Sequence, residues 1–189
     1  MLCVDTNFLL ELLTSKAVEK NTSMLVSPFT KASTKGNWEA AKAILDVKPE
    51  LVRCCITENC ETTLHIAASA KKTKRMQDFV KNLVDMMEVR DLELQNNTSN
   101  IALCLAAAAG NVEMVKILVE KNRTLLVIPG SQQMMPLYMA ALFGDHAMVE
   151  YLYKESKKLS DNGWKFLNRG WLLLKCVESD LFGKQSSMC

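Results

Sequence analysis

The sequence is poor in the residues that make turns and ring contacts. Its 189 residues include four prolines and seven glycines, and aromatic side chains make up 6%. A β-sandwich or barrel needs many turns, so this composition disfavours both and favours helices. The net charge of +2 at pH 7 is too small for a field that attracts nucleic acid, and we expect no nucleic-acid partner. Basic groups at residues 71–75 and 157–158 are interpreted as solvated helix ends.

Features of membrane and secreted proteins are also missing. The longest apolar run, residues 101–109, is far shorter than the ~20 residues of a membrane-spanning helix. No charged-then-apolar leader with a small-residue cleavage site opens the chain. The seven cysteines are an odd number, and free thiols in a reducing compartment fit them better than a disulfide framework. These absences predict a soluble, cytoplasmic chain with no membrane span.

What the sequence does contain is a repeat with a period of 34 to 39 residues. Each copy begins with an apolar anchor and alanines, and three of the four copies then have glycine at a turn. Beyond the turn come apolar residues with the i, i+3, i+4 spacing of one helix face, as at Val115, Leu118 and Val119. A weaker fifth copy begins at Leu173. The four anchors are Phe29, Leu64, Leu103 and Leu137.

Units of this kind bury their apolar faces only against one another. The second copy contains Thr-Leu-His-Ile-Ala over residues 63–67, and together with the period this segment resembles the ankyrin repeat. The resemblance covers residues 28–183. It implies an all-α ankyrin-repeat solenoid of four to five helix–turn–helix units joined by short hairpins.

The repeat divides the chain into three parts. Residues 1–26 are expected to be an N-terminal segment with a capping helix whose leucines would cover the first unit. Residues 27–157 hold the complete repeats, and residues 158–189 hold an incomplete fifth repeat and the C-terminal tail. Four repeats are expected, over residues 27–58, 59–95, 96–130 and 131–157.

A narrower resemblance suggests a biological setting. Residues 35–46, 61–68 and 136–144 look like plant ankyrin proteins that carry a C-terminal four-helix membrane module, the PGG domain. Those relatives are membrane-anchored and associated with stress and defence signalling, so the resemblance implies the same setting here. The module is absent from this sequence. The chain would then correspond to the soluble part of a longer protein, produced by truncation, an alternative transcript or partial duplication.

The hairpins between units depart from the ankyrin pattern. That pattern has glycine two residues before its threonine, whereas Cys60, Ser99 and Gln133 hold these places. A residue other than glycine at positive φ costs about 1 kcal/mol or more, so we predict loosened hairpins and lower stability than in a regular array. Only one unit keeps both the threonine and the histidine of the pattern, as Thr62 and His65.

A cluster of thiols with one histidine raises the hypothesis of a zinc site or a thiol nucleophile. Cys54, Cys55, Cys60 and His65 lie within twelve residues, but their spacing is not that of a zinc finger. His65 also falls where the ankyrin pattern has a structural histidine. No orienting acid, phosphate-binding loop or His-Glu-x-x-His motif accompanies them. We therefore predict no enzyme, no catalytic residue, no metal and no cofactor.

The resemblance instead implies a non-catalytic adaptor that binds a protein partner. Partners of ankyrin stacks meet the exposed ends of the first helices and the hairpin tips. The predicted contacts at the helix ends are Lys35, Ser69, Ala108, Leu142 and Phe143. Those at the tips are Glu61, Asn100 and Gln133.

Two alternatives stay open at these positions. Leu142 and Phe143 would anchor a partner in a shallow groove, but Phe143 could instead pack against its neighbouring unit. The last repeat has an uncovered apolar face at Trp171, Leu172 and Leu173. Through that face the chain would act as a remnant that associates with full-length ankyrin relatives, the alternative function.

Overall fold

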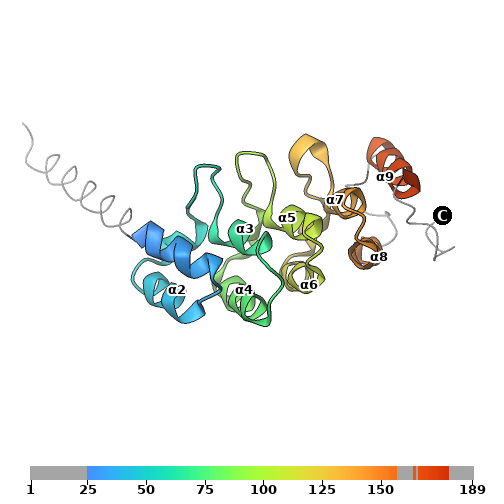
Figure 1. Ribbon diagram of the computed structural model, residues 1–189. Helices are drawn as coiled ribbons and strands as arrows, with labels where there is room; N and C mark the ends of the chain where they lie inside the picture. The colour runs from blue at the N-terminus through green and yellow to red at the C-terminus, as the bar shows by residue number, and fades with distance from the viewer. Residues whose placement is uncertain (1–24, 157–163, 165, 179–189) are drawn as a thin grey trace, which may run out of the picture.

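In the computed structural model the chain is a row of helix pairs (Figure 1). The structure describes residues 25–156, 164 and 166–178. Residues 25 and 26 belong to a helix that includes residues 25–34. The boundary predicted after residue 26 therefore falls inside a helix of the first repeat. The rest of the predicted capping segment lies outside the described residues.

Each repeat consists of a first helix, a turn and a second helix. The first helices are residues 25–34, α3 (Thr63–Ala68), α5 (Ala102–Ala108), α7 (Pro136–Leu142) and α9 (Phe166–Glu178). The second helices are α2 (Trp38–Leu45), α4 (Lys74–Met86), α6 (Val112–Lys121) and α8 (His146–Glu155). Short 3₁₀ turns follow three of them: η1 (Pro49–Arg53) follows α2, η2 (Val89–Glu93) follows α4, and η3 (Arg123–Val127) and η4 (Ser131–Gln133) follow α6. The predicted all-α solenoid is confirmed, and the described residues form no strand longer than a single bridge.

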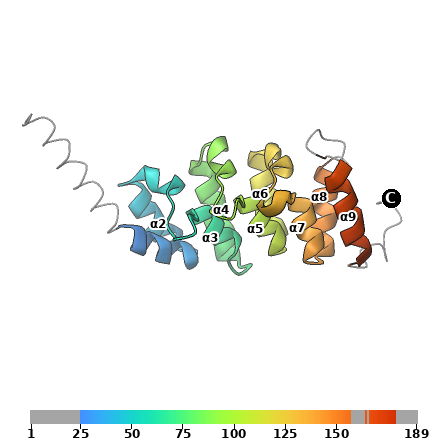
Figure 2. The same cartoon turned by 90° about the horizontal axis from the view of Figure 1, so that it is seen from above.

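The helices lie in two layers. Figure 1 shows the first helices side by side above the second helices, with the repeats following one another in chain order. The view from above in Figure 2 shows the same stacking. Hairpins that connect successive repeats project from one edge of the stack. Each repeat therefore offers a partner a hairpin, a first helix and a turn, repeated along the row.

The turn inside each repeat follows from its sequence. Asp145 caps α8, because its carboxylate accepts the backbone N–H of Met148 at 2.9 Å. In the second repeat Thr73 takes this place and accepts from the N–H of Met76 at 3.2 Å. The other turns place a glycine just before the cap, in the left-handed region that favours glycine. These glycines have φ of 60°, 65° and 69°, at Gly36, Gly110 and Gly144.

The core confirms the repeat of apolar anchors. All four anchors of the complete repeats are at most 1% exposed: Phe29, Leu64, Leu103 and Leu137. Alanines of the first helices, such as Ala67, Ala106 and Ala140, are fully buried. Because an alanine side chain is small, neighbouring first helices can approach closely, and each repeat buries its apolar face on the next.

The three hairpins contain the backbone strain that the sequence predicts. Cys60, Ser99 and Gln133 have φ of 55°, 61° and 62°, the left-handed region in which a side chain is unfavourable. Backbone hydrogen bonds nevertheless close the hairpins, as between the Asn96 N–H and the Asn100 carbonyl at 3.0 Å. The hairpins therefore combine a strained φ at one residue with the backbone hydrogen bonds that close a hairpin.

The register predicted for the fifth copy is wrong, as the burial of residues in α9 shows. The expected anchor, Leu173, is 55% exposed, whereas Leu172 and Cys176 are buried. The buried place is taken by Leu172, one residue before the expected anchor. Three consecutive leucines allow several registers of similar hydrophobicity, and the sequence pattern therefore chose the wrong one.

Candidate protein-interaction surface

The turns between first and second helices lie along one edge of the stack, and we call them the turn row: residues 35–37, 69–73, 109–111 and 143–145. The turns contact neighbouring repeats. Arg75 Nε donates a hydrogen bond to the carbonyl oxygen of Gly36, 3.1 Å away. A Cβ atom on Gly110 would lie 3.1 Å from Lys72 Nζ and would overlap the Asp145 carboxylate. The four turns therefore form one continuous surface.

Five of the predicted contact residues lie on or beside the turn row. Lys35 and Ser69 are exposed, and Ala108 is half-buried. Leu142, the last residue of α7, is 38% exposed, and Phe143 is 61% exposed. Phe143 is therefore not a core residue, and this exposure does not fit the alternative that it packs against its neighbouring unit. Its ring is available to a partner.

The predicted contacts at the hairpin tips fall into two groups. Glu61 is half-buried and Gln133 is exposed. Asn100 is only 8% exposed; its side-chain oxygen accepts the Ser131 N–H at 2.9 Å and its side-chain amide donates to Thr98 at 3.1 Å. The prediction that Asn100 contacts a partner does not fit this burial, because both ends of its side chain are bonded inside the molecule.

His65 is a buried link between hairpins. Its Nδ1 accepts the backbone N–H of Thr62 at 3.3 Å and lies 2.8 Å from the Thr62 hydroxyl. Its Nε2 lies 2.9 Å from the carbonyl oxygen of Asn100, which can only accept, so we assign the proton to Nε2. Burial lowers the pKa of His65 below its ordinary value of 6.5. The ring is a neutral bridge between two repeats.

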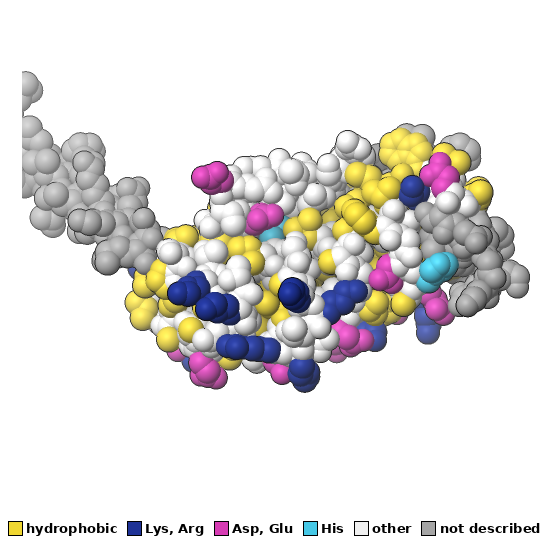
Figure 3. Space-filling view, viewed as in Figure 1, with side chains coloured by type: hydrophobic (Ala, Val, Ile, Leu, Met, Phe, Trp, Pro, Cys, Tyr) yellow, Lys and Arg dark blue, Asp and Glu magenta, His cyan; other side chains and the backbone are white. Residues whose placement is uncertain are grey.

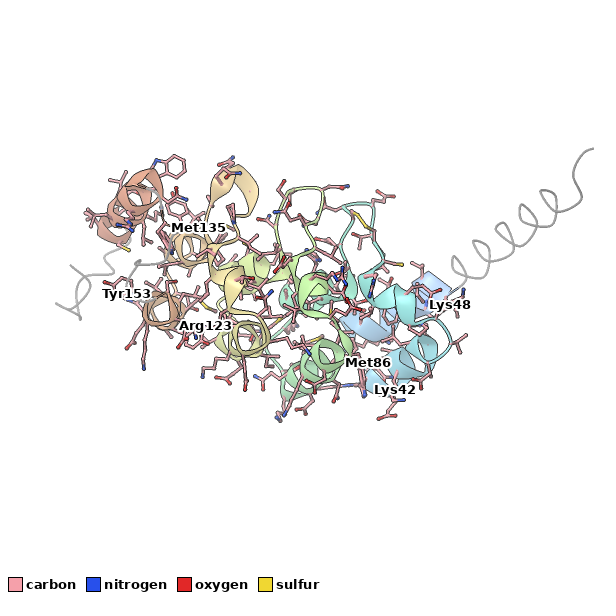
Figure 4. The ribbon with its side chains drawn as sticks, turned by 180° about the vertical axis from the view of Figure 1, so that it is seen from behind. Lys42, Lys48, Met86, Arg123, Met135 and Tyr153 are labelled. Atoms are coloured by element: carbon pink, nitrogen blue, oxygen red, sulfur yellow. A yellow bond between two sulfur atoms is a disulfide. The ribbon has the colours of Figure 1, made fainter. Side chains whose placement is uncertain are left out.

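The cysteines near His65 form no metal site. Cys55 and Cys60 are joined by a disulfide, drawn in yellow in Figure 4, so the expectation of free thiols is wrong for this pair. Hairpin closure explains the bond, because it brings the two Cα atoms to 4.4 Å. Burial raises the pKa of Cys104 to about 12, which keeps that thiol protonated. Among the described residues, no three His, Cys, Asp or Glu side chains are grouped to hold a metal ion.

The association face predicted in the last repeat is altered by the register of α9. Trp171 and Leu173 are exposed as expected, but Leu172 is buried and drops out of the face. Leu174 and Val177, which the prediction did not include, are each 59% exposed. The exposed apolar face of α9 therefore consists of Trp171, Leu173, Leu174 and Val177. The i, i+1, i+4 spacing of the last three was a signal for it.

Sequence reasoning also missed a group of lysines beside the turn row. Lys31, Lys35, Lys71 and Lys72 are exposed, and we call these four residues the basic strip. Lys35, Lys71 and Lys72 lie in the turns of the first two repeats, which the bond from Arg75 to Gly36 joins, and Lys31 lies one helical turn before Lys35. Figure 3 shows dark blue side chains gathered over the first repeats, on the face that carries the turns. Residues 71–75 alone resemble solvated helix ends. Only the stacking places Lys31 and Lys35 next to them.

Comparisons with known proteins agree with this geometry. The family model described as ankyrin repeats in three copies matches residues 64–163. Among solved structures, a chain from the crystal structure of the yeast ribosomal protein Rps3 in complex with its chaperone Yar1 is similar, with a TM-score of 0.60 and 22% sequence identity. The match covers 69% of this chain and 91% of that chain, and at this identity it shows the fold alone. No helix within the described part of the chain is long and apolar enough to cross a membrane.

Proposed function

Because the chain belongs to the ankyrin-repeat family, we propose that it is a non-catalytic adaptor that binds another protein along the turn row and the hairpin tips. The family supplies interaction modules rather than catalysts, and fold alone does not name a partner. The proposal therefore depends on the surface of this particular chain.

The observation that carries the proposal is the exposure of Phe143. An aromatic ring that is 61% exposed at the end of a row of turns leaves apolar area in water. Full burial of an exposed Phe contributes roughly 1.5–3 kcal/mol, and covering the exposed part of Phe143 contributes a share of this. Aromatic anchors of this kind dominate many interfaces. Leu142 beside it enlarges the apolar area. Smaller residues next to the pair, such as Ala108, leave room for a partner's chain.

Replacing Phe143 by Glu tests this function. The matched control is Val47→Glu, because Val47 is 69% exposed and lies after α2, at the end of that helix away from the turn row. Proteins that co-purify with the tagged parent should be lost from F143E and retained by V47E, while circular dichroism of both variants matches the parent. Partners that survive F143E would refute the proposed surface. If F143E loses helical signal, F143S repeats the test with a smaller change.

A second candidate function is favoured by the exposed apolar face of α9, which would bind related ankyrin chains. Leu173, Leu174 and Val177 present it on a helix with no second helix after it in the described residues. The double variant Leu173→Lys with Leu174→Lys should abolish self-association or co-purification with relatives. A control with Val47→Lys and Met86→Lys changes two other exposed apolar residues. Light scattering that finds the parent monomeric, without co-purified relatives, would remove this candidate.

The resemblance to plant ankyrin proteins with a PGG membrane domain suggests where either function operates. We propose a cytoplasmic location next to membrane-anchored relatives, in stress or defence signalling. The support is the sequence of residues 35–46, 61–68 and 136–144. Co-expression with a PGG-bearing relative should bring the tagged chain into the membrane fraction. A chain that stays in the supernatant under these conditions would contradict the proposed setting.

A further inference from the structure

We propose that the basic strip and the Leu142–Phe143 pair form one binding surface for an extended acidic segment of a partner protein. That segment carries Asp or Glu residues at one end and a large apolar side chain at the other. The proposal rests on the proposed function and adds to it the chemistry of the partner.

Three of the four charges of the basic strip, those of Lys31, Lys35 and Lys71, have no acidic partner among the described residues, whereas Lys72 Nζ and the Asp145 carboxylate both lie beside Gly110. Lys31, Lys35, Lys71 and Lys72 form no salt bridge within the part of the chain that the structure describes. Next to them, Lys74 pairs with Asp78 at 2.9 Å. The ammonium groups of Lys31, Lys35 and Lys71 therefore add positive potential at one end of the row, and an acidic ligand gains by approaching it.

Contacts between repeats hold the strip together. Arg75 at the start of α4 bonds to the Gly36 carbonyl, which fixes the turn that follows Lys35 against the second repeat. Lys72 in turn reaches the turn at Gly110. The lysines of the first two repeats therefore face one ligand, although they are about forty residues apart in the chain.

The third repeat separates the charged end from the apolar end. Its turn has no charged side chain of its own. Gly110 is buried beneath the Lys72 ammonium and the Asp145 carboxylate, so a peptide backbone can approach this turn only at the exposed Ala109. Helices pack about 8–10 Å apart, so three steps from the first to the fourth repeat span about 24–30 Å. An extended chain covers this distance with about eight residues. From Lys71 to Phe143, two steps, about five residues suffice.

The sign of the charge changes along the row, and this favours a peptide over nucleic acid. Asp145 stands two residues after Phe143, and its carboxylate lies beside Gly110. A uniform polyanion laid along the whole row would meet this negative group. A segment with acids only opposite the basic strip, and an apolar side chain opposite Phe143, avoids the repulsion.

The test is a selection of random ten-residue peptides displayed on phage against the full chain. Selected peptides are then synthesised and their affinity is measured by fluorescence anisotropy. The test variant carries Lys31→Glu, Lys35→Glu and Lys71→Glu. Its matched control carries Lys81→Glu, Lys121→Glu and Lys154→Glu, the same charge change on the second helices α4, α6 and α8.

The expected result is enrichment of peptides with two or more acidic residues about five to eight positions from Phe, Leu or Trp. Their affinity should fall about tenfold in the test variant and little in the control. It should also weaken as the salt concentration rises from about 50 mM to about 500 mM, since salt screens exposed charges.

The other outcomes distinguish failure of the acidic-segment proposal from failure of the proposed function. Peptides without acidic residues that still need Phe143 would overturn the acidic segment and leave the proposed function standing. Peptides that bind F143E as well as the parent, or no enrichment at all, would overturn both. Displacement of the selected peptides by a single-stranded oligonucleotide that itself binds through the basic strip would show that the strip serves nucleic acid, and would also overturn the acidic segment.

Discussion

The Nε2 atom of His65 donates a hydrogen bond to the carbonyl oxygen of Asn100, 2.9 Å away and 35 residues later in the chain. His65 belongs to the first helix of the second repeat, and Asn100 closes the hairpin that leads into the third. The bond therefore joins two repeats through a side chain that is 2% exposed. Loss of a buried hydrogen-bonding partner costs about 1–3 kcal/mol.

This link makes stability depend on pH. Burial lowers the pKa of His65 from its ordinary value of 6.5, so the unfolded chain takes up a proton before the folded chain does. The contribution is fully present above about pH 6.5 and is lost as the pH falls further. The urea midpoint of the parent should fall between about pH 7.5 and about pH 5.5 more steeply than that of His65→Gln. Equal slopes for the two proteins would contradict the prediction.

Leu103 should be among the most sensitive positions of the core. It is fully buried in α5, so Leu103→Ala removes packed methyl groups and should cost about 2–5 kcal/mol. Leu173→Ala makes the same chemical change at an exposed position of α9 and should cost less than about 0.5 kcal/mol. Urea unfolding of the two variants measures the difference. Similar losses would mean that Leu173 is covered in solution.

Ser99 and Gln133 are positions where glycine should stabilise the chain. Both have positive φ, so Ser99→Gly and Gln133→Gly should each gain up to about 1 kcal/mol by removing backbone strain. The control is Ser69→Gly, because Ser69 has φ of −86° and gains nothing from the change. The melting temperatures of the three variants, compared with that of the parent, measure these changes in stability. A loss of stability at all three would show that the hairpins bear no strain of this kind.

Reduction should weaken the hairpin that contains Cys55 and Cys60. Their disulfide closes a short loop, and opening a loop of this size costs about 2 kcal/mol in the chain-entropy account. A reductant should therefore lower the urea midpoint of the parent and leave the double variant Cys55→Ser with Cys60→Ser unchanged. Alkylation of the unreduced, denatured parent should label two fewer cysteines than after reduction. Full labelling without reductant would show that the bond does not form.

The sequence predicted the features that follow from the spacing of residues within the repeats. Phe29 and Leu103 are buried where the repeat of anchors requires, and positive φ at Ser99 follows from a glycine position that holds serine. The register of α9 could not be predicted, because three adjacent leucines bury equally well. Burial of Asn100 was also missed, since it depends on the Ser131 N–H of the next hairpin.

The sequence predicted only part of the candidate surface, because the rest depends on how one repeat stacks on the next. The exposed end of α7, with Phe143, follows from the alignment of repeats. The basic strip requires Lys31 and Lys71 to lie on the same edge, and this depends on how one repeat stacks on the next. The disulfide likewise depends on hairpin closure, which a count of cysteines does not reveal.

Two kinds of contact set the position of each repeat against the next. Along the hairpin edge, bonds such as His65 to Asn100 fix one spacing. Along the first helices, buried alanines such as Ala106 fix another. Because both sets of contacts hold neighbouring repeats in place, they also set how far Lys31 lies from Phe143. A substitution at His65 or Ala106 would therefore change the length of partner segment that fits, although neither side chain touches the partner.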